Sequence, residues 1–224
     1  MKKFELTAEY VTNIFGKKLF RIKALVEFGN VKEGDLGGFV EKESNLANGG
    51  NAWVYGDARV SGDAQVSGDA RVYGNAQVYG DAQVYGNAWV YGDARVSGDA
   101  QVYGDARVSG DAQVYGDAQV YGDARVSGDA RVSGDAQVSG NAQVSGDLDY
   151  AIVGGFGSEQ RTTTFFRQKD GSVGVKCGCF YGTLEEFRGK VKETHKDSKY
   201  AQEYLMIADL MELHFAGGKE DDER

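Results

Sequence analysis

The chain has 224 residues and a mass of 24.2 kDa, with 33 glycines, no proline and two cysteines. Collagen needs glycine and proline in a strict triplet and a disulfide-stapled fold needs more cysteines, so both classes are excluded. The net charge of −9 argues against direct nucleic-acid binding. No apolar run approaches the ~20 residues that span a bilayer, so we expect a soluble, cytoplasmic protein without a membrane partner.

Residues 1–49 precede a regular repeat and have strand-like composition, which predicts an N-terminal β cap and entry coil. We expect strands over 3–7, 10–15 and 19–28, with a turn at 16–18 between the last two. Val40, Leu46 and Ala52 are six residues apart, so we expect the first coil to begin there in irregular form. A cap is needed because the open end of a strand stack invites end-to-end association.

Residues 50–147 repeat the hexad Gly-Asp/Asn-Ala-x-Val-y without insertion. Position x is Trp, Arg or Gln, and position y is Tyr or Ser. Alanine and valine are two residues apart, so on an extended strand both point to one side, while x and y point to the other. Gly-Asp/Asn is typical of a turn. The hexad therefore predicts a four-residue strand followed by a two-residue turn.

The x residues fall into three columns when they are taken every 18 residues. The Trp53 column is Trp53, Arg71, Trp89, Arg107, Arg125 and Gln143. The Arg59 column is Arg59, Gln77, Arg95, Gln113 and Arg131. The Gln65 column is Gln65, Gln83, Gln101, Gln119 and Gln137. This sorting predicts a triangular prism of about five and a half coils, roughly 26 Å long at the ~4.8 Å spacing of strands.

Residues 148–224 predict a small α+β domain with an acidic tail. Strands are expected over 150–153, 161–168 and 172–176, with a hairpin turn at 169–171. Thr183 and Glu186 form a capping-box pattern that predicts a helix to about Thr194, and helical spacing predicts a second helix over 198–215. The charged tail at 219–224 is expected to be frayed.

An aliphatic residue at i and a small residue at i+4, as in Val54 and Ala58, resembles the hexapeptide-repeat left-handed β-helix. The segments 28–32, 37–40 and 51–55 further resemble the entry segment of YdcK-type β-solenoid proteins. The resemblance implies a left-handed coil, a phage or prophage origin, and the acetyltransferase label that many such proteins have by analogy. We expect a mainly β fold: a left-handed triangular parallel β-solenoid with an N-terminal β cap and a small C-terminal α+β domain.

Aromatic and arginine side chains gather on the first coils of the Trp53 column, which predicts a contact surface. Its expected residues are Trp53, Tyr55, Arg71, Tyr73, Trp89 and Tyr91. We expect Arg71 to lie between the two indoles, within reach of cation–π contact. The alternative is a ladder that only stabilises neighbouring coils. Self-association through this face would satisfy both.

One turn column of the repeat consists entirely of aspartates, namely Asp63, Asp81, Asp99, Asp117 and Asp135. Two unit charges ~4.8 Å apart repel by about 0.9 kcal/mol in bulk water, so stability alone would favour asparagine. A functional interpretation is a rod of regular negative charge that imitates a nucleic-acid backbone or holds cations. The alternative is that aspartate serves the turn and keeps the rod soluble.

Enzymatic and metal-binding chemistry has weak support in the sequence. A hexapeptide acyltransferase generally uses a histidine base beside the solenoid, whereas His195 and His214 both lie outside residues 50–147. Cys177 and Cys179, which strand alternation would place on one face, match zinc-ligand spacing poorly even with both histidines. We therefore expect no catalytic residue, no cofactor and no metal site, with Cys177, Cys179 and His195 as the weak metal candidates.

We expect a non-catalytic binding or scaffold protein whose solenoid presents rigid side-chain ladders to a protein partner, to further copies of itself, or to both. A trimer is one candidate assembly. The acidic repeat and the phage-like resemblance favour an inhibitor of a host nucleic-acid-binding or defence protein. A hexapeptide acyltransferase is the alternative, and a protein that sequesters a small ligand between subunits is a further one.

Overall fold

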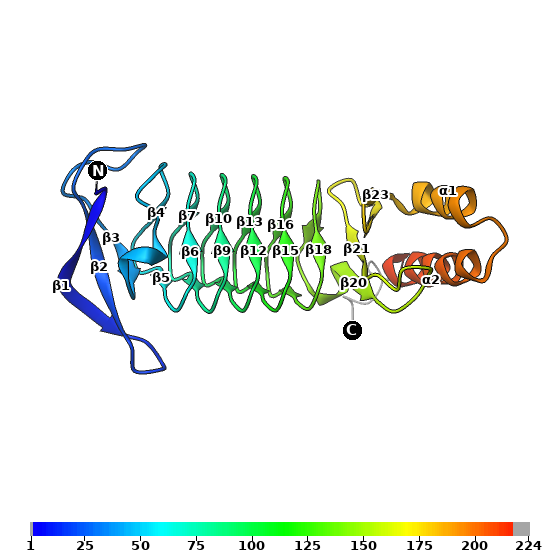
Figure 1. Cartoon of the computed structure of the whole chain (residues 1–224), viewed down its shortest axis with the longest axis horizontal. Coiled ribbons are helices and arrows are strands. Elements are labelled where there is room, and N and C mark those ends of the chain that lie inside the picture. Colours follow the sequence, from blue (N-terminus) through cyan, green and yellow to red (C-terminus); the bar gives the residue numbers. More distant parts are fainter. Residues whose placement is uncertain (1, 217–224) are drawn as a thin grey trace.

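The computed structural model describes residues 2–216, which form an elongated rod (Figure 1). Antiparallel strands lie at its N-terminal end, a β-solenoid of about six turns forms the middle, and a small domain with two helices lies at the other end. The predicted β-solenoid architecture is confirmed. Within residues 2–216, no helix combines the length and the apolar character that crossing a membrane requires.

Three parallel sheets form the faces of the solenoid, and we name each by its first x residue in the repeat. The Trp53 face contains β4 (Trp53–Val54), β7 (Arg71–Val72), β10 (Trp89–Val90), β13 (Arg107–Val108), β16 (Arg125–Val126) and β19 (Gln143–Val144). The Arg59 face contains β3 (Leu36–Val40), β5 (Arg59–Val60), β8 (Gln77–Val78), β11 (Arg95–Val96), β14 (Gln113–Val114) and β17 (Arg131–Val132). The Gln65 face contains β6 (Gln65–Val66), β9 (Gln83–Val84), β12 (Gln101–Val102), β15 (Gln119–Val120) and β18 (Gln137–Val138).

The register of these sheets confirms the 18-residue columns. Trp89 pairs with Arg71 on one side and Arg107 on the other, and Gln101 pairs with Gln83 in the same way. The predicted four-residue strands are wrong in length, because regular strand geometry covers only the x and valine positions. Backbone hydrogen bonds to the next coil nevertheless continue beyond these two residues, so each face remains a continuous ladder.

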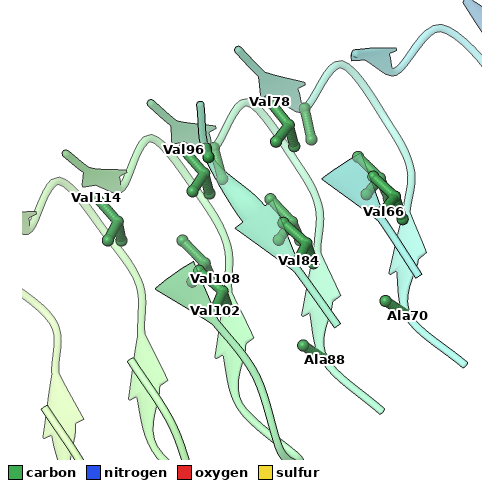
Figure 2. Close-up of a cluster of buried hydrophobic side chains, with 14 of the residues drawn as sticks. Val66, Ala70, Val78, Val84, Ala88, Val96, Val102, Val108 and Val114 are labelled. Atoms are coloured by element: carbon green, nitrogen blue, oxygen red, sulfur yellow. The ribbon is translucent and has the colours of Figure 1, made fainter. Parts of the chain in front are cut away.

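The interior of the solenoid consists of the alanine and valine columns, and all sixteen of each in the repeat are fully buried. The valines of successive coils point into the interior and lie in rows along the rod (Figure 2). Full burial of one valine side chain contributes about 1.5–3 kcal/mol, so these rows are the main stabilising element of the fold. The prediction that alanine and valine share the inner side is confirmed.

Most corners inside the repeat require glycine for two reasons, as Gly98 shows. Gly98 has a φ of +68°, a region that strongly favours glycine. A Cβ atom on Gly98 would lie 3.0 Å from the backbone nitrogen of Gly116 in the next coil. The corners of adjacent coils therefore pack backbone against backbone.

The entry coil is longer than the regular ones. Val40 pairs with Val60, and Leu46 forms a bridge with Val66, so each pair is separated by 20 residues instead of 18. The predicted irregular start of the first coil is present, but Ala52 does not continue the six-residue spacing of Val40 and Leu46. Val54, eight residues after Leu46, is the next valine-type position, because the segment around Gly49 and Gly50 makes a wider corner.

The N-terminal cap is a hairpin of β1 (Phe4–Thr12) and β2 (Lys18–Ala24), which continues through β3 into the Arg59 face. The two strands predicted over 3–7 and 10–15 are one strand, whose pairing is irregular between Leu6 and Tyr10. The turn comes earlier than 16–18, because the Asn13 side chain accepts hydrogen bonds from the backbone nitrogens of Phe15 and Lys17.

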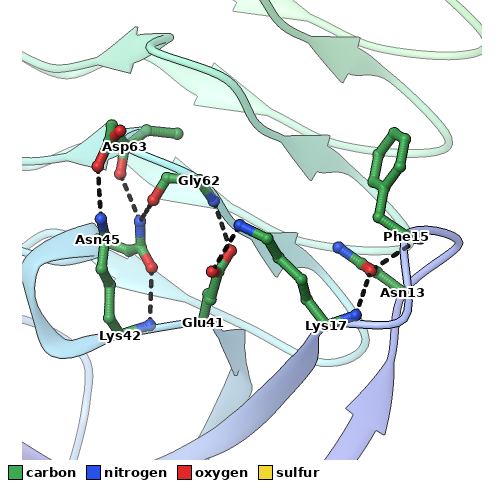
Figure 3. A network of polar contacts seen from close by, with 9 residues as sticks. Asn13, Phe15, Lys17, Glu41, Lys42, Asn45, Gly62 and Asp63 are labelled. Atoms are coloured by element: carbon green, nitrogen blue, oxygen red, sulfur yellow. Dashed lines mark hydrogen bonds and ion pairs between the residues drawn. The ribbon is translucent and has the colours of Figure 1, made fainter.

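Side chains complete the hydrogen bonds that a missing coil would make at each end of the solenoid. At the N-terminal end, Lys3 Nζ donates to the Ala52 carbonyl at 2.8 Å. Asn45 Nδ2 donates to the Ala64 carbonyl at 2.8 Å and to the Gly62 carbonyl at 3.0 Å, and the Asn45–Gly62 contact is visible in Figure 3. Asn45 lies in a short 3-10 turn (Glu43–Asn45). At the C-terminal end, Thr164 Oγ1 accepts from the Gln137 nitrogen at 2.9 Å.

The C-terminal domain packs two helices on a four-stranded antiparallel sheet. Its elements are β20 (Tyr150–Val153), β21 (Thr163–Arg167), β22 (Val173–Cys177), β23 (Phe180–Thr183), α1 (Leu184–His195) and α2 (Lys199–Ala216), after a 3-10 turn (Asp147–Asp149). The predicted strands and helices are present, whereas β23 is an addition. The capping box is confirmed, since Thr183 and Glu186 exchange hydrogen bonds. The prediction for 219–224 lies outside the described residues.

Candidate binding surface

A group of arginine and aromatic side chains lies together on the Trp53 face, and we call it the cation–aromatic cluster. Its members are Arg71, Tyr73, Trp89, Tyr91 and Arg107. The guanidinium carbons of Arg71 and Arg107 are 5.4 Å and 4.9 Å from the centroid of the Trp89 ring. The indole is therefore held between two cations from the neighbouring coils. As predicted, Arg71 lies between Trp53 and Trp89 in the sheet register, and the cation–π contact that it forms is with Trp89.

The tyrosines of the cluster form the second half of the ladder. The rings of Tyr73 and Tyr91 are stacked 4.9 Å apart with 2° between their planes, and Tyr73 also meets Trp89 edge to face at 6.3 Å. Burial raises the pKa of the Tyr73 hydroxyl above its usual value. The side chains that stack along the rod are only half-buried at Tyr73, Trp89 and Tyr91, so part of each remains accessible to solvent.

Trp53 is not part of an exposed surface, which corrects the sequence prediction. Only 1% of this residue is accessible, because Phe4 of β1 and Phe28 cover the indole with edge-on ring contacts at 6.3 Å and 5.3 Å. Tyr55 is half-buried and packs against the same core. The cap thus removes the first coil of the Trp53 face from the predicted contact surface.

A hollow of about 330 Å³ runs beside the cluster along one corner of the rod. Its lining residues are Gly29, Asn51, Asp69, Arg71, Asn87, Trp89, Asp105 and Arg107. The amide of Asn51 donates to Asp69 at 2.8 Å, and the amide of Asn87 donates to Asp105 at 3.1 Å. Cations, an indole and carboxylates therefore meet within one open groove.

The predicted acidic column is assembled along one corner of the solenoid, and its five members are all exposed. They are Asp63, Asp81, Asp99, Asp117 and Asp135. Asp63 forms an ion pair with Lys42, and this hydrogen bond lowers the pKa of its carboxyl group (Figure 3). The other two corners contain asparagine as well, and there Asn51, Asn75 and Asn87 each donate to the aspartate of the next coil. The all-aspartate corner has no such amide donor within the repeat.

Two features of the surface are absent from the predicted site. Arg107 completes the sandwich on Trp89, and its place in the Trp53 column, one coil after Trp89, could have revealed it. A second ladder lies on the Gln65 face, where the rings of Tyr85, Tyr103 and Tyr121 stack 4.8 Å and 5.0 Å apart. The 18-residue spacing of these tyrosines could have predicted this ladder too.

The cysteines and histidines are arranged differently from the prediction. Cys177 ends β22 and accepts a hydrogen bond from Thr163 Oγ1 at 3.1 Å. Gly178, with a φ of +56°, and the exposed Cys179 form the turn to β23, so the thiols do not alternate along one strand. The His195 ring lies 5.6 Å from that of Tyr204 in the helical pair. Among residues 2–216, no three His, Cys, Asp or Glu side chains are grouped as metal ligands would be.

Comparison with known families identifies the repeat. The family model described as the YdcK Beta solenoid repeat matches residues 52–68, 64–80, 82–98, 100–116, 118–134 and 124–140. The expected resemblance is thereby confirmed: the matched segments of the solenoid are similar to the YdcK beta solenoid repeat. A search of curated proteins finds no match. The matched family describes an architecture, so function has to be argued from the surface.

Proposed function

We propose that this β-solenoid chain is a non-catalytic binding protein that presents the cation–aromatic cluster to a protein partner. The observation that carries the proposal is the Trp89 indole, which is held between Arg71 and Arg107 and is only partly buried. Tryptophan, tyrosine and arginine are the side chains that most often dominate the energy of protein interfaces. Here they are concentrated on neighbouring coils of a single face.

The rigidity of the rod supports a role in binding. The backbone nitrogens of Arg71 and Trp89 donate to carbonyls of the following coil at 2.9 Å, and the Trp89 indole is stacked between the guanidinium groups of Arg71 and Arg107. A surface that is already ordered before it meets its partner loses less conformational entropy on binding. The cluster can therefore contribute affinity without reorganising.

The charge of the solenoid favours a basic partner. Residues 50–147 contain 13 aspartates and six arginines, so a rod of roughly 26 Å has about one carboxylate per 2 Å. Double-stranded DNA has one phosphate charge per ~1.7 Å of its axis. Together with the phage association of similar proteins, this density favours a phage-encoded inhibitor of a host nucleic-acid-binding or defence protein, acting in the cytoplasm.

The test is affinity capture from a bacterial host lysate with three versions of the full chain. The cluster variant combines Arg71→Ala, Trp89→Ala and Arg107→Ala, and its matched control combines Arg95→Ala and Arg125→Ala, which remove arginines outside the cluster. We expect the parent and the control to retain the same partner, the cluster variant to lose it, and added salt to weaken its capture. An acidic partner, or capture that persists in the folded cluster variant, would refute the proposal.

The acyltransferase alternative predicts a different result. Binding of acetyl-CoA at 100 times its dissociation constant would stabilise the fold by about 2.7 kcal/mol and raise its melting temperature. A melting curve unchanged by acetyl-CoA would count against the alternative. A small ligand held in the 330 Å³ groove would instead be found by mass spectrometry of the gently isolated protein.

A further inference from the structure

Helix α2 has two apolar faces, of which only one is buried within the chain. Its inner face packs against α1 and the sheet through Tyr204, Ala208, Met211 and Phe215. Met206, Leu210 and Leu213 lie on the opposite side of the helix and are 73%, 58% and 72% exposed. We call these three residues the α2 stripe. A helix that is apolar on opposite sides is typical of one packed between two partners.

The neighbouring helix shows that this exposure is unusual for the domain. Helix α1 buries Leu184, Phe187 and Val191, whereas its exposed positions hold only polar residues and one glycine. Helix α1 is thus an ordinary amphipathic surface helix. The α2 stripe breaks that pattern at three positions within two turns.

Segments of the chain itself supply no cover for the stripe. The eight residues that follow Ala216 are Gly-Gly-Lys-Glu-Asp-Asp-Glu-Arg, which include no apolar side chain. The most exposed apolar residue of the described chain, Ile14, lies in the hairpin at the opposite end of the rod (Figure 1). Because residues 217–224 offer no apolar side chain, we consider another molecule as the occupant of the stripe.

We propose that the α2 stripe is a dimer interface occupied by the α2 stripe of a second copy of this chain. The spacing of the three residues, four and then three, is that of a coiled-coil seam. An antiparallel pair with its two-fold axis beside Leu210 places Met206 of each copy against Leu213 of the other, and the two Leu210 side chains against one another. Such an isologous contact closes on itself and forms a dimer.

Ion pairs beside the stripe limit the charge repulsion that a second copy of the chain would meet. A two-fold axis brings identical flanks together, so unpaired carboxylates there would repel one another. Arg188 of α1 instead pairs with both Asp209 and Glu212 at 2.7 Å, and Lys199 pairs with Glu203 at 3.3 Å. These ion pairs join two cations to three carboxylates, so each chain brings one net negative charge to the flank instead of three. The interface also lies at the tip of the rod, away from the acidic solenoid (Figure 1).

Sedimentation equilibrium of the full chain tests this dimer. We expect the parent to have twice the 24.2 kDa mass of one chain, and Leu210→Glu to have the mass of one. Ile14→Glu is the matched control, because it puts the same charge on an exposed apolar residue at the other end and should stay dimeric. Leu210→Ala, which keeps good helix propensity, should raise the dimer dissociation constant at least tenfold if Leu210→Glu misfolds. A monomeric parent, a trimer, or a dimer that survives both Leu210 substitutions would overturn the proposal.

The two-fold geometry has its own test. In a Cys179→Ser background, Leu210→Cys should form a disulfide-linked dimer on mild oxidation, whereas Lys192→Cys on α1 should not. Equal cross-linking from both positions would overturn the antiparallel arrangement. The cluster variant with Arg71, Trp89 and Arg107 replaced should remain dimeric, so loss of the solenoid partner and loss of the dimer are separate outcomes.

Discussion

Lys3 shows how a single residue closes the N-terminal end of the solenoid at an electrostatic cost. Only 4% of it is accessible, its ammonium group donates to the Ala52 carbonyl at 2.8 Å, and it lies 4.7 Å from the centroid of the Phe28 ring. Burial lowers the pKa of Lys3 from its usual 10.5 to about 8. The folded state therefore resists protonation of this lysine more strongly than the unfolded state does.

This pKa difference predicts that stability rises with pH above about 8. Below pH 8 Lys3 is charged in both states, so the full penalty of burying the charge is present. Between pH 8 and 10.5 the folded state releases the proton first, and the penalty disappears. We expect the free energy of unfolding to rise by about 1–2 kcal/mol from pH 7 to 9.5, measured by urea denaturation.

The matched variants for this pH effect are Lys3→Met and Lys2→Met. Lys3→Met should abolish the rise, whereas Lys2→Met, which replaces an exposed lysine paired with Glu43, should keep it. The same rise in both variants would assign the effect to other groups.

Trp53 and Trp89 occupy the same position of the repeat, yet one is core and the other surface. Their hexads, residues 50–55 and 86–91, are identical, so the local sequence predicts the same outward direction for both. The difference comes from Phe4 and Phe28, which are distant in sequence and cover only the first coil. Hexad periodicity therefore predicts which side of a strand a residue occupies, but not what a neighbouring segment places over it.

At the scale of the strand ladders, the outward tyrosines are expected to stabilise the stack. Tyr103 stacks on Tyr85 at 4.8 Å and on Tyr121 at 5.0 Å. Serine occupies the same repeat position in other coils, so Tyr103→Ser fits the backbone and removes only the ring contacts. Because each aromatic pair contributes about 0.5–1.5 kcal/mol, we expect a loss of about 1–3 kcal/mol in the free energy of unfolding, measured by urea denaturation.

Tyr115 offers the matched control for this ladder. It occupies the same repeat position on the Arg59 face and is 39% exposed, with Ser97 and Ser133 in the coils on either side. Tyr115→Ser should therefore change stability by less than about 0.5 kcal/mol. Equal losses in the two variants would show that burial of the individual ring, and not stacking, provides the stabilisation.

The elements were predictable to the extent that the repeat is regular. The variable x residues fixed the 18-residue register in advance, because each column has its own composition. The entry coil departs from that register because its corner at Gly49 and Gly50 is wider. Leu46 and Ala52 are six residues apart in sequence, but they do not occupy equivalent positions of the coil. The alternation of residues does not predict strand β23, because its four residues follow a two-residue turn. Gly178 has a positive φ and permits the chain to reverse there.

At the scale of the whole molecule, the acidic repeat opposes its own stability. The rings of the tyrosine ladder show that successive coils hold equivalent side chains 4.8–5.0 Å apart, and this distance is shorter than the ~8 Å screening length at physiological salt. Carboxylates in the all-aspartate corner therefore repel their neighbours. Within the repeat, the other two corners relieve part of this repulsion through asparagine amides.

Replacing the middle of that corner should stabilise the rod. Asp81→Asn, Asp99→Asn and Asp117→Asn together are expected to raise the melting temperature by a few degrees at low salt and to reduce its rise with added sodium chloride. The control replaces Asp69, Asp93 and Asp105 by asparagine, which changes net charge equally at positions that already accept an amide hydrogen bond. It should gain less. Equal increases in melting temperature would attribute the effect to net charge alone. A larger increase for the all-aspartate corner would mean that its carboxylates lower the stability of the rod. A partner-binding surface would explain why aspartate is kept there.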